Sequence, residues 1–225
     1  MSLTSSNLFN HNLPNVIIVY HGSDHVVDKP TYGNGKSYND YGRGFYCTED
    51  EHQSDLWASA YPSSVTNKYE LDLSNLKVLR LDKNDIFTWV AILVSNRSLK
   101  DLPFRAQMNC GEFVKKYNKV DLKDYDVVIG YRADDSYFSF MKSFLDGRLT
   151  LEYLRKALDL GNSGYQVALI SPKAFDNLKF ISSKEVNDHN ITEEYFNKDR
   201  IARNTYKDYE RKSYYSKSGF IDEFL

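Results

Sequence analysis

Residues 16–23 and 40–48 read VIIVYHGS and DYGRGFYCT, and these two stretches decide the fold. The first opens with a β-branched apolar run, which is typical of a buried strand that ends at its histidine and glycine. The second ends in a glycine followed by another short strand pattern. Residues 23–43 are polar and rich in Gly, Pro, Asn and Asp, so we expect a loop, and loops of this length tend to be functional. Five of the 11 glycines fall between Gly22 and Gly44, where backbone has to turn tightly or approach a neighbour closely.

The rest of the chain mixes helix and strand patterns without a regular alternation. Helical periodicity and capping residues predict helices over residues 49–61, 86–97, 104–117, 137–145, 151–158 and 193–215. Thr48 with Glu51, and Thr192, are the residues expected to cap the first and last of these. Short apolar runs predict further strands at 69–73, 76–81, 126–130, 166–170 and 178–182. The mixture favours an α+β fold, with one domain over residues 1–187 and a basic helical extension at 188–225 packed on it.

The composition of the 225 residues narrows the class of protein. Hydrophobic residues make up 41% and charged residues 27%, which excludes both extended disorder and a membrane protein. The net charge of -2, from 29 basic and 31 acidic residues, argues against a protein that coats nucleic acid. Two cysteines without CxxC spacing and five histidines without an HExxH pattern predict no disulfide framework and no metal. No apolar run reaches the roughly 18 residues of a membrane span, so we expect a cytoplasmic protein without membrane contact.

One histidine and two aromatic residues near these strands suit a flat heteroaromatic ligand attached to a sugar. His21 ends a buried strand, where a hydrogen-bonding group is held rigidly. Tyr46 alternates with Phe45, so one of the two rings faces the core and the other can face a cleft. Trp57 follows Tyr46 by 11 residues and lies on the next helix, which can bring its indole over the same cleft. The alternative is that all three residues are ordinary members of the core.

These residues resemble the ADP-ribosyltransferase superfamily, in the branch named for its His-Tyr-Glu triad, which includes diphtheria-like toxins and the poly-ADP-ribose polymerases. The sequence YHGS looks like the first-strand motif, and GRGFYCTED followed by SDLWA is similar to the second-strand motif with its second stacking aromatic. A closer resemblance is to an uncharacterised bacterial family of the same superfamily. Its pattern runs YHG[ST], D-[FY]-G-x-GFY-x-T, WA, D-V-V-I-G-x-x-A-D-D and a glutamine in a late strand. The resemblance covers about residues 17–181.

The resemblance implies a split antiparallel β-sandwich with surrounding helices and NAD as co-substrate. By this resemblance, His21 bonds the ribose hydroxyls and the backbone of Gly22 holds the nicotinamide amide. Tyr46 stacks on the nicotinamide ring, and Trp57 closes its other face. The residues expected to bind NAD are His21, Gly22, Ser23, Gly44, Phe45, Tyr46 and Trp57.

The third catalytic position departs from the family triad. The superfamily places a glutamate on a late strand, and the matching residue here is Gln166, so the expected catalytic residues are His21, Tyr46 and Gln166. A neutral amide can accept a hydrogen bond from the ribose but supplies no negative charge for the developing cation. Three alternatives follow: the site works with Gln166, the carboxylates of Asp134 and Asp135 substitute, or catalysis is weak or absent.

The resemblance therefore favours a mono-ADP-ribosyltransferase that cleaves the nicotinamide glycosidic bond of NAD and transfers ADP-ribose to a protein or nucleic acid. A bacterial toxin or defence effector, restrained by a neutralising partner protein, is the expected setting by analogy. A second hypothesis is a non-catalytic module that binds NAD or ADP-ribose, because of Gln166. A third is a nucleic-acid-modifying enzyme in which the basic C-terminal helix guides the substrate.

Overall fold

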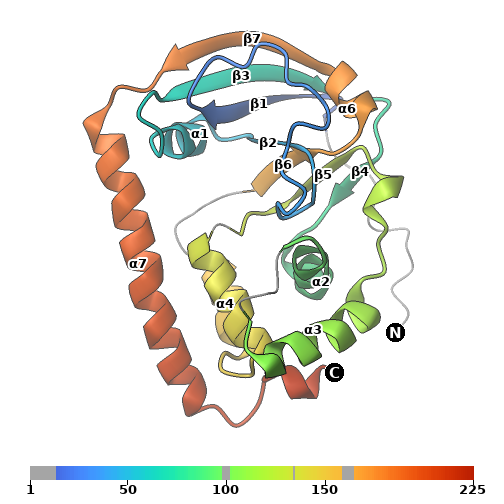
Figure 1. The fold of residues 1–225 in the computed structure, drawn as a ribbon, viewed down its shortest axis with the longest axis vertical. Helices are drawn as coiled ribbons and strands as arrows, with labels where there is room; N and C mark the ends of the chain where they lie inside the picture. Colours follow the sequence, from blue (N-terminus) through green and yellow to red (C-terminus); the bar gives the residue numbers. More distant parts are fainter. Residues whose placement is uncertain (1–13, 98–101, 134, 159–164) are drawn as a thin grey trace.

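A computed structural model describes residues 14–97, 102–133, 135–158 and 165–225. The α+β class is confirmed: within these residues helices pack around one seven-stranded mixed sheet, in the strand order β4-β5-β6-β2-β1-β3-β7 (Figure 1). The strands are β1 (Val16–Ser23), β2 (Phe45–Thr48), β3 (Val65–Asp72), β4 (Val78–Arg80), β5 (Val127–Tyr131), β6 (Tyr165–Leu169) and β7 (Leu178–Glu185). The helices are α1 (Glu51–Ala58), α2 (Ile86–Asn96), α3 (Phe104–Tyr117), α4 (Asp135–Leu145), α5 (Leu151–Leu158), α6 (Pro172–Asp176) and α7 (His189–Tyr214).

The sheet has two arms that meet at a narrow join. In one arm, β1 pairs antiparallel with β3 along eight residues and β3 pairs antiparallel with β7. In the other arm, β2 and β5 both run antiparallel to β6, and β4 is parallel to β5. A single registered pair, Tyr20 with Thr48, connects β1 to β2. Gln166 is in register with Thr48 on the far side of β2, so the ends of β1, β2 and β6 lie in a row across the join.

Each face of the sheet carries its own hydrophobic core. The larger core includes α2 to α5, with Trp89, Phe113 and Phe144 fully buried. The smaller core covers the other face and contains Val19 and Tyr69 together with Val127, Ile129, Val167 and Leu169 of β5 and β6. Residues of the two buried strands β5 and β6 alternate between the cores, which explains their continuous apolar pattern in the sequence.

Several element boundaries differ from the sequence prediction. The first helix is capped by Asp50, whose carboxylate accepts from the backbone N–H groups of His52 and Gln53, and not by Thr48. The last helix is likewise capped by Asp188, four residues before the expected Thr192. The third strand begins at Val65, earlier than predicted, because cross-strand pairing with β1 extends through its polar residues. The short helix α6 was not predicted.

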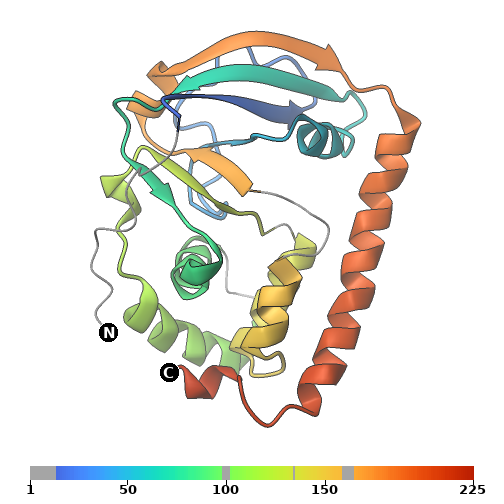
Figure 2. The same cartoon turned by 180° about the vertical axis from the view of Figure 1, so that it is seen from behind.

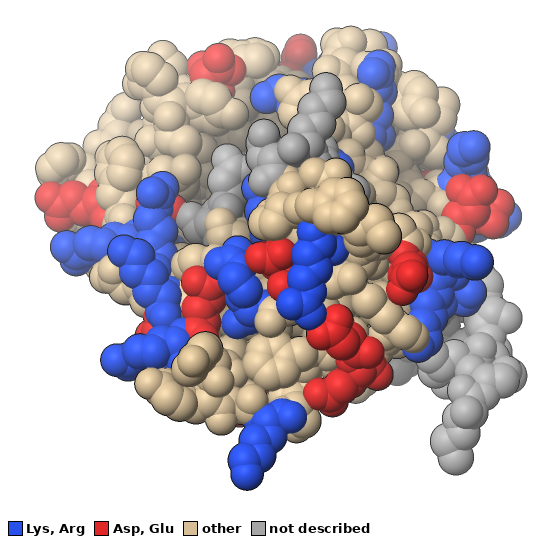
Figure 3. Space-filling model, turned by 60° about the horizontal axis from the view of Figure 1, so that its bottom comes forward, with Lys and Arg blue, Asp and Glu red and all other residues tan. Residues whose placement is uncertain are grey.

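Helix α7 runs along the side of the molecule, from the end of β7 past α4 (Figures 1 and 2). It packs on α1, α4 and α5, and the segment beyond it returns to the core, where Ile221 is fully buried. Four of its basic residues have acidic partners along the helix, in the pairs Lys198–Glu194, Arg203–Asp199, Arg211–Asp208 and Lys212–Asp208. On the face shown in Figure 3, acidic side chains lie among the basic ones. These pairs weaken the argument for α7 as a guide for nucleic acid.

Among the helices of the described residues, none combines the length and the apolar character that crossing a lipid bilayer requires.

Candidate functional site

The end of β1 lies directly against α1, and Gly22 makes this contact possible. A Cβ atom at Gly22 would lie 2.6 Å from the backbone nitrogen of Ala58 and closer still to the carbonyl oxygen of Ser54. Backbone atoms cannot move aside as a flexible side chain can, so only glycine fits here. The same position is 3.1 Å from the Cβ of Trp57. The structure therefore brings Gly22 and Trp57 together, and it also gives the glycine a packing role.

His21 is held with one ring nitrogen committed and the other left as an acceptor. Its ring packs on that of Phe45, with centroids 4.3 Å apart, and Nδ1 lies 2.7 Å from the carbonyl oxygen of Tyr46. A carbonyl only accepts hydrogen bonds, so Nδ1 carries the proton and Nε2 keeps its lone pair. Burial lowers the pKa of His21, and the hydrogen bond to Tyr46 offsets only part of this effect. The imidazole is therefore neutral at pH 7, and Nε2 can accept a hydrogen bond from a hydroxyl.

The side chain of Tyr46 lies on the opposite face of the sheet from the ring of His21. Phe45, which touches His21, packs with the smaller core, whereas Tyr46 packs with the larger one. The Tyr46 hydroxyl donates to the carbonyl of Gly42 at 2.6 Å and accepts from the backbone N–H of Tyr41 at 3.0 Å. Burial raises its pKa. This hydroxyl therefore anchors the end of the long loop.

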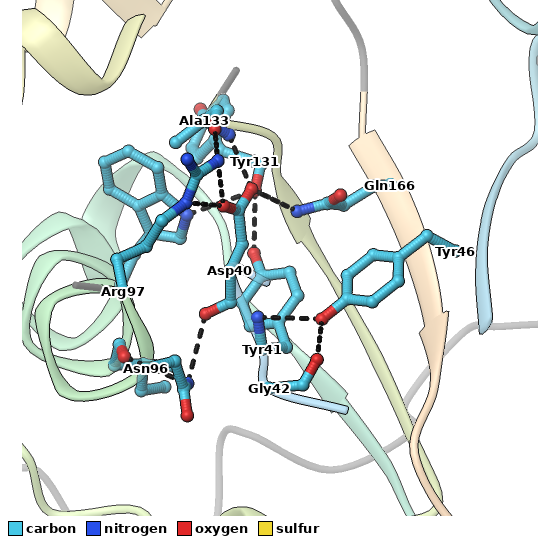
Figure 4. Close-up of polar contacts among 11 residues, drawn as sticks. Asp40, Tyr41, Gly42, Tyr46, Asn96, Arg97, Tyr131, Ala133 and Gln166 are labelled. Carbon is cyan, nitrogen blue, oxygen red and sulfur yellow. Dashed lines mark hydrogen bonds and ion pairs between the residues drawn. The ribbon is translucent and has the colours of Figure 1, made fainter. Parts of the chain in front are cut away.

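Gln166 shares the face of Tyr46 and is bound to a buried carboxylate (Figure 4). Its amide nitrogen donates to Oδ2 of Asp40 at 2.9 Å and to the carbonyl of Tyr131 at 3.1 Å. Arg97 contacts Oδ1 of Asp40 with Nε at 2.8 Å and Nη2 at 2.7 Å. The backbone N–H of Ala133 donates to Oδ2 at 2.8 Å. Because Asp40 and Gln166 are only 4% and 3% exposed, these contacts form a buried ion pair whose carboxylate is fully compensated.

This network joins the loop to α2, β5 and β6. The carbonyl of Tyr131 also accepts from the hydroxyl of Tyr41 at 2.8 Å and from Nε1 of Trp89 at 3.1 Å. The side-chain amide of Asn96 donates to the carbonyl of Asp40 at 3.1 Å. The end of the loop and the end of β5 are therefore held in one position relative to each other.

The negative charge nearest to Gln166 in this network belongs to Asp40, which the sequence analysis did not propose. It opens the DYGRGFYCT stretch, and a lone acid just before a glycine-flanked strand is the signal that could have identified it. Arg97 pairs with Asp40 across 57 residues of the chain, and this distance hides the identity of the partner from the sequence. Asp134 lies outside the described residues, as does the side chain of Asp135, so these two alternatives remain predictions.

The other end of the loop is anchored to β3. The side chain of Asn67 accepts from the backbone N–H of Val27 at 2.8 Å and donates to the hydroxyl of Ser23 at 2.9 Å. The hydroxyl of Tyr69 donates to the carbonyl of Val27. Ser23, expected to bind NAD, thus has partners within the protein. Gly44, expected to do the same, lies against β6, where a Cβ atom would come within 2.5 Å of the carbonyl oxygen of Leu169.

The planar, positively charged guanidinium of Arg132 lies over the indole of Trp57. The guanidinium carbon of Arg132 lies 4.5 Å from the centre of the indole ring. The indole nitrogen is buried and has no hydrogen-bond partner among the described residues. Two pockets of about 330 and 470 Å³ are present elsewhere, and His21, Trp57 and Gln166 line neither of them. In this structure the guanidinium of Arg132 therefore lies against the indole that was expected to close over the nicotinamide.

Comparison with known proteins identifies the family but no characterised relative. No curated protein and no solved structure is significantly similar to the chain. The matching family model is described as "Protein of unknown function (DUF3990)" and aligns with residues 17–180, from β1 into β7. This span includes the loop anchors, α1 and the network around Asp40. It covers most of the chain, which therefore belongs to the DUF3990 family.

Proposed function

We propose that this protein binds NAD and cleaves the bond between its ribose and nicotinamide, transferring ADP-ribose to a macromolecular acceptor. The observation that carries the proposal is the planar cation on Trp57 beside the end of β1. The nicotinamide ring of NAD is itself a planar cation, and an indole face is the best aromatic partner for one. We also propose that the two-armed sheet is the split β-sandwich of ADP-ribosyltransferases, which its narrow join at Tyr20 and Thr48 supports.

His21 supplies the second element of the proposed site. Its Nε2 can accept a hydrogen bond from a ribose hydroxyl, while the carbonyl of Tyr46 holds the ring in place. The row formed by the ends of β1, β2 and β6 keeps His21, Thr48 and Gln166 on neighbouring strands. Thr48 and Gln166 share one face and the ring of His21 lies on the other, so a ribose that contacts both His21 and Gln166 would lie at the edge of the join.

The proposed reaction breaks the glycosidic bond and returns its electron pair to the ring nitrogen, which releases neutral nicotinamide. The ribose carbon becomes cation-like, the acceptor forms the new bond to it, and the acceptor's proton passes to solvent. Gln166 would act through its position and not through charge, because the neighbouring charge of Asp40 is balanced by Arg97. Such a site orients the ribose but gives the developing cation less electrostatic stabilisation than a free glutamate would.

A second candidate function is a module that binds NAD or ADP-ribose without cleaving it. The amide nitrogen of Gln166 is already committed to Asp40 and to the carbonyl of Tyr131. Because these hydrogen bonds fix the amide within the protein, Gln166 is less able to contact a substrate during a reaction. We propose that the acceptor is a protein or a nucleic acid and that a partner protein neutralises the activity.

Nicotinamide release from labelled NAD separates the two candidates. We expect release by the unaltered protein, a loss of at least tenfold in His21→Ala and Trp57→Ala, and full activity in the control His25→Ala, whose side chain is exposed nearby. Binding of NAD without release would favour the binding module. Release that survives both site substitutions, or absence of NAD binding in the folded protein, would refute the proposed site. Transfer of label in a lysate to protein or to nucleic acid would identify the acceptor class.

A further inference from the structure

The backbone on both sides of Arg132, just after β5, is held by several hydrogen bonds. The carbonyl before it, that of Tyr131, accepts three hydrogen bonds, from Tyr41, Trp89 and Gln166. The residue after it, Ala133, donates its N–H to Asp40 and accepts from Arg97 through its carbonyl. The buried ion pair therefore holds the backbone on both sides of Arg132, while the arginine side chain itself extends to Trp57.

The guanidinium and the nicotinamide ring of NAD are alike in the two properties that an indole face recognises. Both are flat and both carry a delocalised positive charge. Two cations cannot share one face of an indole, and on opposite faces each would weaken the attraction of the other. A neutral dihydronicotinamide ring, or a ligand with no ring at that position, escapes this competition.

We propose that Arg132 is a selectivity residue that occupies the Trp57 face in the empty site and competes there with a cationic ring. The inference rests on the proposed function and deepens it. Ligands that carry the diphosphate and ribose without a positive ring, such as ADP-ribose, are then favoured relative to NAD. Arg132 thus favours binding of ADP-ribose over binding of NAD, and the nicotinamide ring takes the same indole face only when the guanidinium leaves it.

The charge of the ligand ring is the variable that tests this inference. Titration calorimetry would compare NAD, NADH and ADP-ribose on the unaltered protein and on Arg132→Gln. We expect Arg132→Gln to bind NAD about tenfold more tightly and to bind NADH and ADP-ribose unchanged. The milder Arg132→Lys keeps the charge but not the flat stacking group, and we expect a smaller gain. The matched control is Arg80→Gln, which removes another arginine from an aromatic ring, that of Tyr165 at 5.9 Å, and should change nothing.

Two results would overturn the inference while leaving NAD binding intact. Equal NAD affinity in Arg132→Gln and the unaltered protein would show that the arginine does not compete. Weaker binding of all three nucleotides would show that Arg132 pairs with phosphate instead.

A smaller pair of probes separates failure of this inference from failure of the proposed function. 1-Methylnicotinamide, methylated on its ring nitrogen, is a planar cation without ribose or phosphate, and nicotinamide is its neutral counterpart. If no nucleotide binds but Arg132→Gln gains affinity for 1-methylnicotinamide and not for nicotinamide, the competition at Trp57 stands and the NAD proposal fails. If neither probe nor nucleotide binds to any folded variant, both fail.

Discussion

Replacing Gln166 by glutamate would introduce the carboxylate that the proposed function favours at this position, and it would also place a second carboxylate beside Asp40. The resemblance to ADP-ribosyltransferases predicts that this change adds the charge missing from the site. The structure predicts a conflict, because the amide nitrogen of Gln166 donates to Asp40 and a carboxylate has no hydrogen to donate. The two expectations therefore differ in stability as well as in activity.

The cost follows from the distance. At 2.9 Å and an effective dielectric constant of about 20, two negative charges repel by about 6 kcal/mol. Protonating a carboxyl of ordinary pKa near 4.3 at pH 7 costs only about 4 kcal/mol, so the folded variant takes up a proton instead. We expect a loss of about 4 kcal/mol in the free energy of unfolding at pH 7. For a chain of this size that corresponds to a fall of about 10 °C in melting temperature.

The pH dependence gives the loss a signature. The introduced carboxyl has a pKa in the folded state above its unfolded value, so the folded protein binds a proton that the unfolded chain releases. The stability of Gln166→Glu relative to the unaltered protein is then greatest below about pH 4 and falls by about 1.4 kcal/mol per pH unit as pH rises towards the folded pKa. A neutral replacement, Gln166→Met, also loses the hydrogen bond but leaves this slope unchanged.

Urea denaturation at pH 5, 6, 7 and 8 measures the effect, with nicotinamide release followed in parallel. The double variant Asp40→Asn with Gln166→Glu removes one of the two charges and should lose most of the excess pH dependence. If Gln166→Glu is as stable as the unaltered protein across this range, the reasoning about the buried ion pair is wrong. If it also releases nicotinamide faster, the missing charge is the better explanation of Gln166.

Three further predictions concern the frame of the site. Gly22→Ala should destabilise the protein by about 2 kcal/mol or more, because the new Cβ meets the backbone of α1. The control Gly111→Ala, which has open space around it in a helix, should stabilise the protein by up to about 1 kcal/mol. Thermal melts of both variants measure the two effects. Tyr46→Phe keeps the ring but removes the hydroxyl that holds the loop, so it should lower the free energy of unfolding by about 1–3 kcal/mol. It should also speed proteolysis within residues 28–39. Equal cleavage rates in the variant and the unaltered protein would show that this hydroxyl does not anchor the loop. Burial raises the pKa of the Cys110 thiol to about 11 and raises the pKa of the Cys47 thiol as well. Both thiols should therefore resist alkylation by iodoacetamide at pH 8 until urea unfolds the chain. Rapid labelling of the folded protein would show that the thiols are not buried.

Much of the fold could be read from local patterns, and the site could be read only in part. Helix α3 was predicted with its observed limits, because amphipathic periodicity is a property of neighbouring residues. The start of β3 was missed, since residues 65–68 carry polar side chains and join the sheet through pairing with β1. Helix starts at Asp50 and Asp188 were displaced by a few residues, because several capping residues stand close together in each place.

The arrangement of the site was harder to predict from the sequence than the fold. His21 and Tyr46 were expected to act together, yet alternation along β2 sends the ring beside His21 and the ring of Tyr46 to different faces. From the sequence, Gln166 was considered only as a residue of the proposed catalytic site. Its observed partner, Asp40, is 126 residues away, and pairing between such distant polar residues leaves no periodic trace in a single sequence.

The two anchors of the long loop have a consequence for engineering. Val27 is fixed to β3 by Asn67 and Tyr69, and Asp40 is fixed by Arg97 and Gln166, so both points of attachment are made by residues outside 28–39. Residues 28–39 thus form an exchangeable cassette above a rigid base. Libraries of altered length or composition in this cassette should keep the fold and vary what the protein admits to the end of β1.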